Sequence, residues 1–204
     1  MIYLNSNYAK IRKETEGKGP VYAWANILRV ATMLRVADTY GPIPYSKIGE
    51  GGITVEYDSV EDAYHNMFTD LNNSIAFFTA YLADNPTGNP MGEFDPVYGG
   101  DFSKWLKFAN SLKLLMAVRI ASVDTEFAKK AMQEAITAGV IETNAENAVL
   151  QVQKKNPYYL ASHDWGDLAI SATLSAYMNG YEDPRRSAYM TMASYQSAYR
   201  GVRM

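Results

Sequence analysis

YGGDFSKWLKFANSLKL, residues Tyr98–Leu114, is the stretch that indicates the fold of this chain most strongly. Two glycines close the preceding loop, and we expect a helix to begin near Ser103 and to end near Ser122. Apolar residues recur along it at spacings of three and four, so one face of the helix is predicted to be buried. The residues predicted on that face are Trp105, Phe108, Ala109, Leu112, Leu115 and Met116.

Three further segments show the same helical period on either side of this stretch. One helix is expected over residues 21–40, after Pro20 and before a stop at Gly41. A second is expected to start with Ser59 as its N-cap, and a third to follow Asp124 and close at Gly139. Their predicted buried faces contain Trp24, Ile27, Leu28, Ala31 and Leu34, then Tyr64, Phe68, Leu71, Ile75, Phe78 and Leu82, then Ala128, Ala131, Met132, Ala135 and Ile136.

The remaining segments are less regular. The proline- and glycine-rich residues 83–100 predict a long loop. Residues 148–152 suggest a short strand, residues 156–159 a turn and residues 171–178 a short helix. The polar residues 1–19 are interpreted as a flexible lead-in. The sequence therefore predicts an all-α fold with little β-structure. The helices on either side of residues 122–124 are expected to pair as in tetratricopeptide-type units.

Composition excludes several classes of protein. The formal net charge is −3 and there is no long basic run, which argues against a nucleic-acid partner. The chain contains no cysteine, so it offers no disulfide, thiolate metal ligand or lipidated cysteine. It has no apolar window of 18 residues that would predict a transmembrane helix. The first residues also lack the pattern of a signal peptide.

Catalytic and metal-binding motifs are not found. The sequence has no nucleophile elbow, phosphate-binding loop or dinucleotide fingerprint. Its two histidines are His65 and His163, and the spacing of Glu61 and His65 is that of an ordinary surface pair on a helix. His163 and Asp164 are interpreted as polar loop. We therefore predict no enzymatic activity, no metal and no cofactor.

Aromatic residues are abundant, with 16 tyrosines and 3 tryptophans. Their rings combine a flat apolar face with a hydrogen-bonding edge. That combination suits a sugar, which has an apolar C–H face and a rim of hydroxyl groups. The same rings also fill helix interfaces, so each aromatic residue has a packing interpretation beside the binding one.

Four ordered motifs resemble the SusD/RagB family of Bacteroidetes outer-membrane lipoproteins. The first is RVADTYGPIPY at residues 35–45, and the second is YDSVEDAY at residues 57–64, followed by DLN at residues 70–72. The third is the stretch that begins at Tyr98, and the fourth is YEDPR at residues 181–185. Leu115 departs from the family pattern, in which arginine is common, and Arg186 stands where an apolar residue is common.

The resemblance implies a helical domain over residues 20–204, as the central segment of a longer family pattern. It also implies capture of oligosaccharides, or in some members peptides, at the bacterial outer membrane. The nutrient would pass to a SusC-like TonB-dependent transporter, and membrane association would come from a lipid anchor outside this chain. The shared motifs themselves are interpreted as structural, with Asp183-Pro184-Arg185 tying down a loop.

Candidate ligand-binding residues are aromatic residues in the irregular regions, since binding residues in this family are expected on variable loops. They are Tyr158, Tyr159, Trp165 and Tyr181. The competing interpretation is that these rings pack against a further part of the protein. An alternative function is a helical-repeat scaffold that binds a protein or peptide partner. A glycosidase with unrecognised carboxylates is a third class, which the sequence does not favour.

Overall fold

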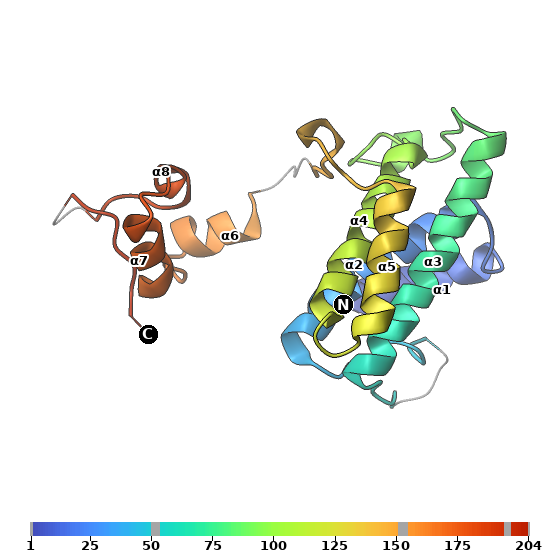
Figure 1. Cartoon of the computed structure of the whole chain (residues 1–204), viewed down its shortest axis with the longest axis horizontal. Coiled ribbons are helices and arrows are strands. Elements are labelled where there is room, and N and C mark those ends of the chain that lie inside the picture. The colour runs from blue at the N-terminus through green and yellow to red at the C-terminus, as the bar shows by residue number, and fades with distance from the viewer. Residues whose placement is uncertain (1, 50–53, 151–154, 194–196, 204) are drawn as a thin grey trace. The chain divides into compact units, whose positions relative to one another are not determined.

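The computed structural model describes residues 2–49, 54–150, 155–193 and 197–203. The chain divides into two compact units, Met1–Leu150 (unit 1) and Gln151–Met204 (unit 2). Figure 1 shows that both units are built from helices and loops. Within the described ranges the β-structure is limited to isolated bridges, so the prediction of an all-α fold is confirmed.

Unit 1 begins with a helix that the sequence interpretation missed. Helix α1 spans Ile2–Glu14, so the expectation of a flexible lead-in over residues 1–19 is wrong for most of that segment. The physical reason is tertiary: Tyr8 is buried against α2, and its hydroxyl donates a hydrogen bond of 2.6 Å to Oδ1 of Asn26. The helix ends where Glu16 and Gly17 adopt positive φ angles.

Helices α2 (Gly19–Tyr40) and α3 (Val60–Asp84) form the centre of unit 1. The predicted cap of α3 is confirmed, because the Ser59 hydroxyl accepts a hydrogen bond of 3.0 Å from the Asp62 amide. The most deeply buried face of α2 is rotated from the predicted one and runs through Ile27, Val30 and Met33. Burial of these apolar side chains is the main source of stability in this unit.

Helices α4 (Phe102–Ile120) and α5 (Thr125–Ala138) follow as an adjacent pair (Figure 1). The predicted caps Asp124 and Gly139 are confirmed for α5. Trp105 is 2% exposed and anchors α4 in the core. Leu115 and Ile136 were predicted to be buried, but they are 44% and 56% exposed. These two side chains lie at the edges of their apolar stripes, where they are open to solvent.

The long loop before α4 is ordered by one carboxylate. Asp95 accepts hydrogen bonds from the backbone amides of Val97, Tyr98 and Gly100 and from Nε1 of Trp105, the last at 2.6 Å. These donors lower the pKa of the buried Asp95 carboxyl, even though burial alone would raise it. A short 3₁₀ helix, η1 (Gly92–Phe94), lies in the same loop, and η2 (Asn144–Glu146) follows α5.

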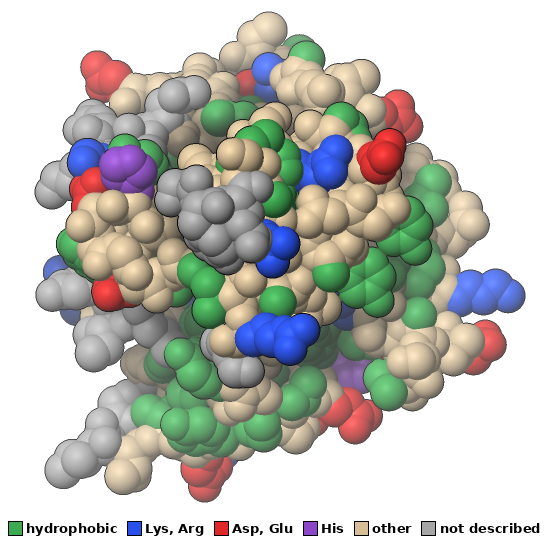
Figure 2. Space-filling model, turned by 90° about the vertical axis from the view of Figure 1, so that its left-hand side faces the viewer, with side chains coloured by type: hydrophobic (Ala, Val, Ile, Leu, Met, Phe, Trp, Pro, Cys, Tyr) green, Lys and Arg blue, Asp and Glu red, His purple; other side chains and the backbone are tan. Residues whose placement is uncertain are grey.

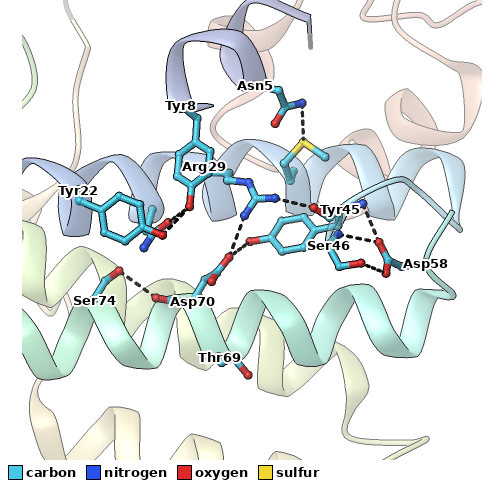
Figure 3. A network of polar contacts seen from close by, with 12 residues as sticks. Asn5, Tyr8, Tyr22, Arg29, Tyr45, Ser46, Asp58, Thr69, Asp70 and Ser74 are labelled. Atoms are coloured by element: carbon cyan, nitrogen blue, oxygen red, sulfur yellow. Dashed lines mark hydrogen bonds and ion pairs between the residues drawn. The ribbon is translucent and has the colours of Figure 1, made fainter. Parts of the chain in front are cut away.

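A buried polar network ties α1, α2 and α3 together (Figure 3). Arg29 donates to a carboxylate oxygen of Asp70 at 3.0 Å and to the Tyr45 carbonyl at 2.6 Å, and its guanidinium lies 4.0 Å from the centre of the Tyr45 ring. The Tyr45 hydroxyl donates to the same oxygen of Asp70 at 2.7 Å. Burial, together with the Asp70 charge, raises the pKa of Tyr45 far above its usual value.

Unit 2 consists of short elements. They are α6 (Pro157–Tyr159), the π-helical turn η3 (Leu160–Asp164), α7 (Ala172–Gly180) and α8 (Arg186–Tyr189). The short helix predicted at residues 171–178 is therefore confirmed. Residues 156–159 begin a helix instead of forming a turn, because Asn156 caps it. Residues 148–150 form no strand, and the rest of that predicted strand, 151–152, lies outside the described residues.

Candidate ligand-binding surface

All four predicted binding residues lie in unit 2, where they fall into two groups. Tyr158, Tyr159 and Trp165 belong to the segment of α6 and η3, which we call the α6 cluster together with Lys155 and His163. Tyr181 belongs to a cleft at the end of α7, which we call the α7 cleft.

The α6 cluster owes its shape to local capping. Oδ1 of Asn156 accepts a hydrogen bond of 2.9 Å from the Tyr158 amide, and Pro157 occupies the first helical turn. The chain then widens into the π-helical turn, in which the Trp165 amide donates to the Leu160 carbonyl at 2.9 Å. Single π-helical turns occur frequently at functional sites. This turn ends at Trp165, whose ring is 66% exposed.

Charged groups surround the aromatic rings of the α6 cluster. The rings of Tyr159 and His163 stack with centroids 4.6 Å apart and planes 13° apart. The Lys155 ammonium lies 5.3 Å from the centre of the Tyr159 ring and 2.6 Å from a carboxylate oxygen of Asp164. Exposed ring faces beside a cation and a carboxylate can stack on an apolar face and hydrogen-bond to hydroxyl groups.

The α7 cleft is walled by tyrosines. Tyr177 and Tyr181 lie one helical turn apart, with ring centroids separated by 6.4 Å and planes inclined by 13°. They are 63% and 80% exposed, so their faces are open to a ligand. The cleft encloses about 260 Å³, and Tyr189 contributes a third ring to its lining.

An ion pair lies in the lining of the same cleft. Nε and Nη2 of Arg185 donate to the two carboxylate oxygens of Asp183 at 2.9 and 2.6 Å. These contacts, and the hydrogen bond from the Arg185 backbone amide, lower the pKa of Asp183 to about 2. The Asp183 amide also donates to the Met178 carbonyl at 2.9 Å, so this motif does hold the loop after α7.

Sequence reasoning found Tyr181 but missed Tyr177, Tyr189 and Arg185 as members of the same cleft. The spacing of Tyr177 and Tyr181 is a signal that could have paired the first two rings, since residues four apart share a helix face. Figure 2 looks onto the side of Figure 1 on which α6, α7 and α8 are drawn. It shows hydrophobic side chains reaching the surface in several groups, with single Lys, Arg, Asp and Glu side chains between them.

The structure gives no indication of a metal centre within its described residues. No group of three His, Cys, Asp or Glu side chains converges in that part of the chain. His65 lies 3.6 Å from a carboxylate oxygen of Asp124 and meets the ring of Phe127 edge-on, with centroids 4.8 Å apart. These contacts join α3 to α5 and serve the packing of unit 1.

Comparison with known proteins places this geometry in a family. The family model described as "SusD-like: Susd and RagB outer membrane lipoprotein" matches residues 1–204. A SusD-like protein from Bacteroides thetaiotaomicron is 38% identical, with a TM-score of 0.90 over 98% of this chain. The chain belongs to the SusD-like family. The prediction made from the four motifs is therefore confirmed.

Other SusD-like structures agree with this assignment. A SusD homologue from Bacteroides uniformis is 39% identical, with a TM-score of 0.87, and covers 98% of this chain. A chitin-binding SusD homologue from Flavobacterium johnsoniae is 34% identical, with a TM-score of 0.90 and the same coverage of this chain. The curated proteins contain no match.

The chain corresponds to part of these relatives. It spans 42% of the B. thetaiotaomicron protein, 43% of the B. uniformis protein and 42% of the F. johnsoniae protein. The family description is that of outer membrane lipoproteins. Among the helices of the described residues, none is both long and apolar enough to cross a membrane.

Proposed function

We propose that this SusD-like chain binds oligosaccharides without turning them over, as part of a nutrient-capture protein at the bacterial outer membrane. The observation that carries the proposal is the pair of open aromatic surfaces in unit 2, the α6 cluster and the α7 cleft. The similarity to the chitin-binding SusD homologue from F. johnsoniae supports a glycan as the ligand.

The physical argument rests on ring faces that the protein leaves open. Trp165 is 66% exposed, Tyr158 67% and Tyr181 80%. A pyranose ring can lay its C–H face on such a ring while its hydroxyl groups reach the Lys155–Asp164 and Asp183–Arg185 pairs. The two surfaces would then contact separate units of a glycan, and specificity would depend on their spacing.

Delivery to a SusC-like TonB-dependent transporter and attachment through a lipid anchor outside this chain complete the proposal. Both roles follow from membership of the SusD-like family. They concern a protein of the length of the SusD-like relatives, of which this chain spans less than half. The role that we propose is non-catalytic, and the geometry around Asp183 supports it for that one carboxylate. The carboxylate of Asp183 is held by Arg185 with a pKa of about 2, so it is unsuited to act as a general acid near neutral pH.

Isothermal titration calorimetry tests the proposal with chitooligosaccharides, maltooligosaccharides and xylooligosaccharides. We expect one class to bind, and Trp165→Ala or Tyr181→Ala to weaken the affinity about tenfold, equivalent to about 1.4 kcal/mol. Tyr40→Ala is the matched control, because Tyr40 is 75% exposed but belongs to unit 1. Equal losses in Tyr40→Ala, or shortening of the glycan during incubation, would overturn the proposal.

A scaffold that binds a protein or peptide partner is the second candidate function. It is favoured by exposed apolar side chains on the α4–α5 pair, where Val118 is 56% and Ile136 56% exposed. Pull-down of a transporter fragment by the wild-type chain but not by Val118→Asp with Ile136→Asp would support this role. Retained capture by that double variant would count against it.

A further inference from the structure

Unit 1 contains a hollow that the proposed function does not use. It lies where the start of α2 faces the middle of α3, and it encloses about 390 Å³. The rings of Tyr22 and Phe77 and the amides of Asn26 and Asn73 line it. This volume falls within the range of about 300–1,000 Å³ found for small-molecule sites, and the lining combines rings with a few polar groups in the manner of such sites.

The walls of this hollow are held in place by contacts behind them. The Tyr8 hydroxyl donates to Oδ1 of Asn26 at 2.6 Å and lies 3.0 Å from the Tyr22 hydroxyl, and both tyrosines belong to the network drawn in Figure 3. On the other side, the ring of Phe77 stacks on Tyr81, with centroids 5.9 Å apart and planes 21° apart. Because the rings are fixed before a ligand arrives, binding there would cost little additional ordering.

A second hollow adjoins the first and carries positive charge. It encloses about 570 Å³, shares Gly17 and Tyr22 with the first hollow, and is lined by Arg12, Lys13 and Glu16. Lys18 lines the first hollow. Among the described residues that line the two hollows, three cations stand against one carboxylate, so this lining is positive although the whole chain has a net charge of −3.

Among the described residues, the three cations of the hollows form no ion pair that would compete with a ligand. Within the described residues, no ion pair involves Arg12, Lys13 or Lys18. Arg12 and Lys13 lie in the last turn of α1, where the helix dipole stabilises positive charge. That placement explains why the helix tolerates them, and it also leaves both side chains available to an anion from solvent.

We propose that the two adjoining hollows form a second ligand site, which takes an acidic sugar unit. The sugar ring would lie against Tyr22 and Phe77, with its hydroxyl groups at the amides of Asn26 and Asn73. Its anionic substituent, a carboxylate or a sulfate, would lie in the second hollow near Arg12 and Lys13. The site is in unit 1, so it does not depend on the α6 cluster or the α7 cleft.

The test is calorimetric titration of the chain with trigalacturonate, a sulfated trisaccharide and neutral cellotriose. Binding of an acidic trisaccharide, at least tenfold tighter than that of cellotriose and weakening as salt rises, is the expected result. Comparison of the carboxylated and the sulfated probe identifies which anion is preferred. Failure of both acidic probes to bind the folded chain would overturn the proposal.

Matched variants locate the site. Arg12→Gln with Lys13→Gln, and separately Asn73→Ala, are expected to weaken acidic-sugar binding at least tenfold. Lys10→Gln and Asn72→Ala are controls, because both side chains are exposed on the same helices but do not line the hollows. If acidic-sugar binding were weakened equally in the variants and in the controls, the proposal of a second ligand site would also be overturned. Trp165→Ala separates the two proposals, since it should impair neutral-glycan binding and leave acidic-sugar binding unchanged.

Discussion

Units 1 and 2 are stabilised in different ways. In unit 1, long helices bury a continuous apolar core that includes Ile27, Phe68 and Trp105. In the described part of unit 2, the buried hydrophobic side chains are Met178 and Met190, and the short helices depend on caps and turns. Unit 1 is therefore a scaffold specified by packing. The other leaves its aromatic side chains available at the surface.

The largest expected difference between the units comes from replacing one tryptophan in each. Trp105→Ala removes a ring that is 2% exposed, together with its hydrogen bond to Asp95, and should lower the free energy of unfolding by about 4 kcal/mol. Trp165→Ala removes a ring that is 66% exposed and should change it by less than about 0.5 kcal/mol. Urea denaturation followed by circular dichroism measures both, and similar losses would contradict the contrast.

The buried ion pair of unit 1 gives the next largest effect. Asp70→Asn leaves the Arg29 guanidinium, with a side chain 7% exposed, without its counter-charge and should cost about 3 kcal/mol. Asp84→Asn, at the exposed end of the same helix, is the control and should be nearly neutral. Thermal unfolding of the two variants provides the measurement. A stable Asp70→Asn chain would mean that the network in Figure 3 is not needed for stability.

Both units contain a helix that begins with a serine N-cap, so the same change can be made in each. Ser59→Ala and Ser171→Ala each remove a hydroxyl that accepts a backbone hydrogen bond at a helix N-terminus, worth about 1 kcal/mol. In unit 1 we expect this loss in global stability, because α3 unfolds with the core. In unit 2 we expect faster amide exchange confined to α7. Global destabilisation by Ser171→Ala would show that the two units unfold together.

The smallest effect concerns pH. The pKa of Asp183 is lowered to about 2, so its pairing with Arg185 stabilises the α7 cleft above the ordinary carboxyl pKa of 3.8. That contribution is lost as pH falls from about 4 through 2. Carboxyl-carbon NMR titration should therefore give a midpoint near 2 for Asp183. Arg185→Gln should raise it toward 3.8, whereas Arg203→Gln should not; an ordinary midpoint in the wild-type chain would contradict the pairing.

The helices that could be predicted are those in which local signals and packing agree. For α3 and α5, the N-caps Ser59 and Asp124 and the apolar spacing predict helices that the structure contains. Helix α1 could not be predicted, since it has no clear apolar stripe and depends on the burial of Tyr8 against α2. Leu115 shows the opposite error, because spacing alone does not tell which side of a helix has a neighbour.

The hollow of unit 1 was less predictable than the fold, because it joins residues that are distant in sequence. Composition pointed to exposed aromatics, and Tyr158, Tyr159, Trp165 and Tyr181 are exposed to varying degrees, although their role in binding stays a prediction. The hollow in unit 1 brings Tyr22 near Phe77 only through the packing of α2 on α3. No local pattern encodes that approach.

Hydrogen–deuterium exchange with and without a saturating neutral glycan tests whether the aromatic surfaces of unit 2 bind the ligand. The glycan would be the oligosaccharide class found to bind by calorimetry. We expect protection to appear in residues 156–165 and 172–189, which contain the α6 cluster and the α7 cleft, while the core helices of unit 1 exchange unchanged. Saturated binding with no added protection in either segment of unit 2 would contradict it.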